Sequence, residues 1–150
     1  MGASMGGYGA LRCALLNPNQ YGFCCAFSSA CLYLQEYLSD EELDVEEMKS
    51  IYGRQLVNDF QSIYGKELSG RPKEDIIQLA EEAQAQTDEL KVYMTCGIKD
   101  DFRSENLRFR DEMKKLPFDY TYEEWQGGHN WYFFNESLKK ALAWMHNIEG

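Results

Sequence analysis

A serine stands near the start of the chain between two glycines, in the order Gly2-Ala3-Ser4-Met5-Gly6. This spacing fits the pattern G-x-S-x-G, in which a serine sits on a sharp turn between a strand and a helix. The small residues of the motif let neighbouring backbone approach closely and leave the hydroxyl accessible. Ser4 is therefore the first candidate for chemistry, as a nucleophile.

A serine hydroxyl is a poor nucleophile until a base takes its proton and an acid orients that base. His129 is the candidate base, because Gly127-Gly128 before it lets the backbone turn sharply and present the ring. The other histidine, His146, lies near the C-terminus and is expected at the surface. Asp100 and Asp101 are the candidate acids, and their position alone leaves both open.

Each of these signals has a simpler explanation when it is taken alone. A G-x-S-x-G motif also fits a glycine-rich helix start or a phosphate cradle at a helix N-terminus. A single histidine is more often structural, and a pair of aspartates in a loop is usually solvated. Their chain order is Ser, Asp, His, and each is expected behind a strand of its own, so together they favour catalysis.

The elements that must position these residues alternate between helix and strand. Apolar runs predict buried strands over 21–30 and 90–97, and alternating aromatic and polar residues predict a strand over 118–125. Helices are expected over 6–16, 105–116 and 131–145, the last with Leu138, Leu142 and Met145 on one face. This order is typical of an α/β fold with a parallel sheet. The candidate residues then fall in loops at the carboxyl edge, although the strand before Ser4 is expected to be absent.

Residues 35–90 differ from the rest because their pattern is almost wholly helical. Ser39 and Glu42 have the spacing of a capping box and predict a helix start. We expect a helical insertion over about 35–90 within a single partial domain that spans residues 1–150.

The composition excludes several functional classes. A net charge of -10 argues against nucleic acid or an anionic membrane as the main partner. No apolar run is long enough to cross a membrane. Five cysteines, two of them adjacent, do not resemble a disulfide framework, and a cytoplasmic location is expected. Cysteine and histidine spacing fits no metal site, so neither metal nor cofactor is expected.

Three segments together resemble a known family. GASMGGYGAL, CGIKDDFRSENLRF and GGHNWYFFNESL are similar to the carboxyl-terminal half of the esterase D and tributyrin esterase-like family. That family also contains S-formylglutathione hydrolases, acetyl esterases and feruloyl esterases. The resemblance implies an α/β-hydrolase fold that is truncated, with a parallel sheet lacking its N-terminal strands.

The resemblance also implies roles for individual residues. Ser4 would be the nucleophile and His129 the general base. The family pattern Cys-Gly-x-x-Asp, with an Asn-Leu pair six residues on, favours Asp100 as the acid and leaves Asp101 second. The N–H of Met5 would be one oxyanion-hole donor. Family members contribute the other donor and the supporting strands from an N-terminal half.

We expect a serine carboxylic ester hydrolase that acts on a short-chain acyl, acetyl or feruloyl-type ester through an acyl-enzyme. Ser28 and Trp131 are the candidate pocket residues. A transferase or a carbon–carbon hydrolase could use the same three residues. The alternative of another class is a catalytically inactive fragment that acts at most as an interaction module. Exposed sheet edges would favour a homo-oligomer or a complementing N-terminal half.

Overall fold

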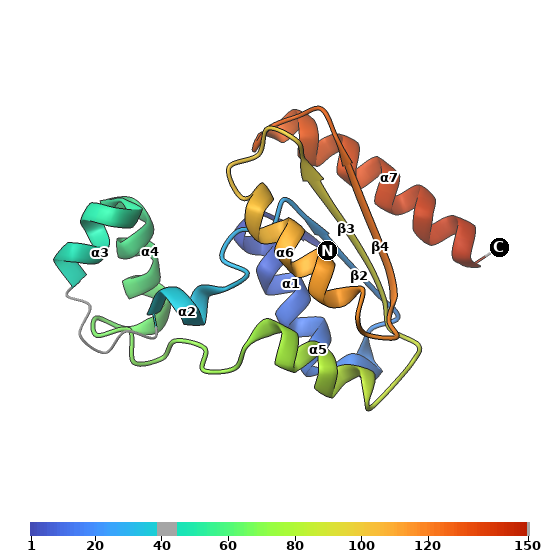
Figure 1. The fold of residues 1–150 in the computed structure, drawn as a ribbon, viewed down its shortest axis with the longest axis horizontal. Helices are drawn as coiled ribbons and strands as arrows, with labels where there is room; N and C mark the ends of the chain where they lie inside the picture. Colours follow the sequence, from blue (N-terminus) through green and yellow to red (C-terminus); the bar gives the residue numbers. More distant parts are fainter. Residues whose placement is uncertain (39–44, 150) are drawn as a thin grey trace. The chain divides into compact units, whose positions relative to one another are not determined.

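The computed structural model describes residues 1–38 and 45–149, which form two compact units. The first unit comprises 1–32 and 76–150, and the second comprises 33–75. Figure 1 shows the elements of both units along the chain. The Ser39 and Glu42 capping box lies outside the described residues.

The first unit contains a parallel sheet with the strand order β1-β2-β3-β4. Its strands are β1 (Gly2–Ala3), β2 (Phe23–Phe27), β3 (Lys91–Gly97) and β4 (Asp119–Trp125). Its helices are α1 (Met5–Leu16), α5 (Ile76–Gln84), α6 (Arg103–Met113) and α7 (Trp131–Glu149), with a 3₁₀ turn at Pro18–Gln20. The predicted parallel sheet is therefore present, with each strand paired to the next one in the chain.

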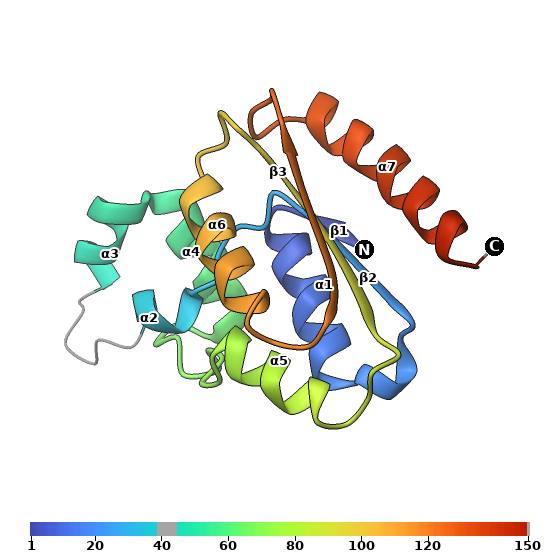
Figure 2. The same ribbon diagram turned by 45° about the vertical axis from the view of Figure 1, so that its right-hand side comes forward.

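Helices cover the sheet on both faces, with α1, α5 and α6 on one side and α7 on the other (Figure 2). Both faces of β2 and β3 are buried, which explains their nearly continuous apolar sequence. On the α7 face, Tyr93 stacks on Trp144 with ring centroids 5.2 Å apart, and Cys25 and Phe27 belong to the same core cluster.

The strand before Ser4 is not wholly absent, so the sequence-based expectation was wrong on this point. Gly2 and Ala3 form β1 and pair in parallel with Ala26 and Phe27 of β2. Two residues are too few to show strand periodicity, so the pairing becomes visible only when β2 is in place.

The second unit is helical. It contains α2 (Leu34–Leu38), α3 (Val45–Tyr52) and α4 (Arg54–Tyr64). Gly53 separates α3 from α4 with a φ of 88°, a conformation that favours glycine. Val57 and Phe60 are the buried side chains of α4. The unit ends at residue 75, and α5 belongs to the first unit; the insertion bounds of about 35–90 remain a prediction.

Candidate active site

Ser4 occupies the turn between β1 and α1 with φ 56° and ψ -128°. A positive φ is unusual for a residue with a side chain and stores strain that its surroundings must balance. The N–H of Ser4 donates to the Phe27 carbonyl at 2.9 Å, and its own carbonyl accepts from Ala30 N–H at 3.1 Å. A Cβ on Gly2 would overlap the Gly6 carbonyl, so this turn requires glycine at position 2.

His129 lies between Ser4 and Asp100. Its Nε2 is 2.8 Å from Ser4 Oγ, and its Nδ1 is 3.2 and 3.1 Å from the two carboxylate oxygens of Asp100. An ionised carboxylate can only accept, so Nδ1 carries the proton and donates it to Asp100. Nε2 is then free to accept from the serine hydroxyl. The arrangement can move a proton from Ser4 to His129.

The two aspartates differ in their surroundings. The side chain of Asp100 is fully buried, whereas Asp101 is exposed. Asp100 Oδ1 also accepts from the Phe102 N–H at 2.9 Å, which fixes the carboxylate in its turn. Of the two candidates, only Asp100 is hydrogen-bonded to His129.

Two short loops hold these side chains. The N–H of Lys99 donates to the Gly127 carbonyl at 2.9 Å, and a Cβ on Gly97 would overlap that same carbonyl. Asn130 Oδ1 accepts from the Phe133 N–H at 3.1 Å and so caps the start of α7 directly after His129. Sequence reasoning missed Asn130, although asparagine before a helical pattern is a recognisable capping signal.

Two aromatic side chains flank the histidine ring. Phe102 and Phe134 approach His129 edge-on, with ring centroids 5.0 and 5.1 Å from the centroid of the imidazole.

Arg103 binds Glu124 through two nitrogens at 2.9 and 3.2 Å, which joins the start of α6 to the end of β4. These hydrogen bonds from Arg103 lower the pKa of Glu124. Burial raises the pKa of the Cys96 thiol to about 12, so this cysteine is not a competing nucleophile.

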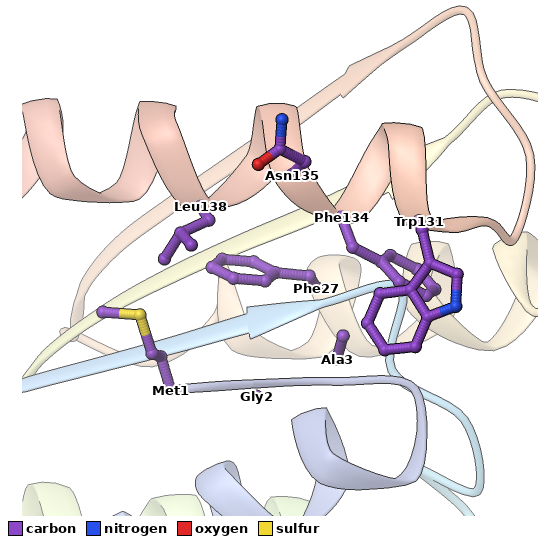
Figure 3. A pocket seen from close by; sticks show the side chains of 8 residues that line it. All are labelled: Met1, Gly2, Ala3, Phe27, Trp131, Phe134, Asn135 and Leu138. Atoms are coloured by element: carbon purple, nitrogen blue, oxygen red, sulfur yellow. The ribbon is translucent and has the colours of Figure 1, made fainter.

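An apolar hollow of about 260 Å³ lies between β1 and α7. Figure 3 shows Phe27, Phe134 and Leu138 around it, with Trp131 at one end. Its lining residues are Met1, Gly2, Ala3, Phe27, Trp131, Phe134, Asn135 and Leu138. The hollow adjoins the candidate site because Ala3 precedes Ser4 and Phe134 contacts His129.

The remaining predicted site residues are placed differently. Trp131 is 83% exposed and lines the hollow, whereas Ser28 is fully buried and is not among the residues that line it. Met5 is the first residue of α1, where a backbone N–H has no carbonyl partner within the helix.

Residues 1–38 and 45–149 contain neither a membrane-spanning helix nor a cluster of metal-ligating side chains. No helix there is both long and apolar enough to cross a membrane. No three histidine, cysteine, aspartate or glutamate side chains in those ranges gather as a metal ion would need.

Known proteins resemble this chain over nearly its full length. A family model described as "Putative esterase" matches residues 1–145. An acetyl esterase from Caldicellulosiruptor saccharolyticus is 30% identical over 148 residues, which are 98% of this chain and 53% of that protein. The chain thus spans about half the length of this curated relative.

Two solved structures from Staphylococcus aureus are also similar. The S-formylglutathione hydrolase FrmB aligns with a TM-score of 0.66 and 25% identity, over 96% of this chain and 52% of that one. The fluorophosphonate-binding serine hydrolase FphF aligns with a TM-score of 0.65 and 26% identity over the same shares.

Proposed function

Because this chain belongs to the "Putative esterase" family, we propose that it carries the nucleophile, base and acid of a serine carboxylic ester hydrolase. The predicted α/β-hydrolase fold is confirmed by the similar solved structures, of which the chain covers about half. The observation that carries the proposal is the hydrogen-bonded series Ser4, His129 and buried Asp100.

In the proposed reaction, Ser4 Oγ attacks the ester carbonyl while His129 Nε2 takes the hydroxyl proton. Asp100 accepts the Nδ1–H bond and stabilises the imidazolium that forms. The N–H of Met5 donates to the oxyanion. The imidazolium then protonates the departing alcohol, which leaves an acyl-enzyme on Ser4. Water, deprotonated by His129, attacks this acyl group, and the imidazolium returns the proton to Ser4 Oγ as the carboxylic acid is released.

The hollow beside Ser4 indicates an uncharged acyl group. None of the side chains that line it is charged, and most are apolar or aromatic. A short acyl, acetyl or feruloyl-type group fits such a lining better than an anionic one, because a charge loses its hydration there without gaining a partner. This supports an uncharged ester as the substrate.

Trp131→Ala is expected to raise KM about tenfold for an aromatic acyl ester and to leave KM for an acetyl ester within about twofold. The reason is that the indole covers one end of the hollow, where only a larger acyl group reaches it. Tyr132→Ala is the matched control, since Tyr132 is 89% exposed and does not line the hollow. Equal KM changes in the two variants would remove Trp131 from the acyl site.

The function is tested by labelling the purified chain with a fluorophosphonate probe and measuring the intact mass. We expect one probe per wild-type chain and none on Ser4→Ala. Ser104→Ala is the control, because Ser104 is an exposed serine on α6. Circular dichroism must show that all three proteins are folded. A folded wild type that takes no label would contradict the proposal and favour the inactive interaction module.

A further inference from the structure

A buried asparagine on α6 bonds the segment after β2 and Phe102, the residue that precedes α6 in the turn of Asp100. Asn106 is fully buried, and its Nδ2 donates to the Ser29 carbonyl at 2.8 Å and to the Phe102 carbonyl at 2.9 Å. Its Oδ1 accepts from the Ser29 N–H at 3.2 Å. Both amide hydrogens and the oxygen are therefore used, and all three bonds go to backbone.

One end of this network leads to the proposed nucleophile. Asn106 holds Ser29 by both its N–H and its carbonyl, and the next residue, Ala30, donates its N–H to the Ser4 carbonyl at 3.1 Å. Ser29 also packs against the first turn of α1, because a Cβ on Gly7 would lie 2.5 Å from Ser29 Oγ. The segment after β2 thus supports the strained turn at Ser4.

The other end leads to the acid. Phe102, whose carbonyl accepts from Asn106, donates its own N–H to Asp100 Oδ1 at 2.9 Å. The phenyl ring of Phe102 also contacts the imidazole of His129. The Phe102 carbonyl also accepts from the backbone N–H of Asn106 at 3.1 Å, so a change of the Asn106 side chain would loosen this turn rather than release it.

We propose that Asn106 is a positioning residue that fixes the distance between the turn of Ser4 and the loop of Asp100. It contacts neither Ser4 nor His129, so it acts through Ser29, Ala30 and Phe102. This inference rests on the function proposed above. The buried amide ties the start of α6 to the segment after β2, and a misplacement of about 1 Å can cost about 100-fold in rate.

The test compares Asn106→Ala with Asn106→Asp, which keeps the size and the Oδ1 acceptor but loses the amide donors. Arg108→Ala is the control, since Arg108 lies on the exposed face of the same helix and pairs with Glu112. Turnover and probe labelling are measured per folded molecule. We expect kcat to fall about 10- to 100-fold in both variants with KM within twofold. If Asn106→Ala does not fold, turnover and probe labelling of Asn106→Asp alone test the proposal.

A second readout does not depend on activity. The Nδ1 proton of His129, observed by NMR in chain labelled with ¹⁵N-histidine, is expected to move upfield in both variants and to stay in place in Arg108→Ala. His129→Gln assigns the signal, because the chain has two histidines. A lower melting temperature with unchanged kcat and an unchanged Nδ1 proton would overturn the proposal.

The two proposals fail in different ways. If folded wild type takes no fluorophosphonate, the proposed function fails, and the Nδ1 proton of the Asn106 variants still decides whether Asn106 positions the histidine and its acid. If wild type labels and the Asn106 variants behave like Arg108→Ala, only the role of Asn106 is lost.

Discussion

Asp100→Asn is expected to lower kcat about 10⁴-fold, whereas Asp101→Asn changes it less than about threefold. An asparagine at position 100 can present an NH₂ group to His129 Nδ1. The ring then places its proton on Nε2, where it can no longer accept from Ser4. The buried carboxylate, 3.1 and 3.2 Å from Nδ1, prevents this in the wild type.

The measurement is ester turnover by both variants, alongside the rate of fluorophosphonate labelling. Asp101→Asn is the matched control, because it makes the same chemical change one residue away at an exposed position. If the two variants lose turnover equally, the loop acts through its overall charge and Asp100 has no special role. A loss confined to Asp101→Asn would reverse the assignment.

The convergence of Ser4, Asp100 and His129 could be predicted because parallel strands end at one edge of their sheet. The residues alone could not separate Asp100 from Asp101. That choice depends on a turn in which Asp100 N–H donates to the Gly97 carbonyl at 3.0 Å, while the register sets Gly97 beside Trp125. Such a turn has no periodic sequence signal, and only the family resemblance favoured Asp100.

The packing of α7 shows what periodicity misses. Of the three residues predicted to share a face, Met145 packs against the core, yet Leu138 and Leu142 are 38% and 53% exposed. The side chains buried on this helix include Ser137 and Ala141, and Ser137 bonds Thr95 of β3 at 2.8 Å. Small residues bring a helix close to a sheet, and a hydrogen bond between buried hydroxyls offsets their polarity. A count of large apolar residues therefore misses the small residues at the centre of the buried face.

Asn106 illustrates a different limit. The Asn106 amide bonds the backbone of Ser29, 77 residues away, and of Phe102, four residues away. No pattern in the sequence connects Asn106 to Ser29. Family spacing singled out the Asn-Leu pair without giving it a role. The positioning role that we propose for Asn106 rests on the three bonds of its amide.

His129→Ala is expected to reduce kcat about 10⁶-fold, to the background of Ser4→Ala, because no other base reaches Ser4 Oγ within the described residues. His146→Ala is the control, since His146 is exposed near the end of α7. Ester turnover is measured with both variants shown to be folded. We expect His146→Ala to keep the wild-type kcat and His129→Ala to lose it. Combining Ser4→Ala with His129→Ala should cost little more than either change alone, because the two side chains act as one unit. If the losses instead multiply, Ser4 and His129 work independently, and the acyl-enzyme mechanism is wrong.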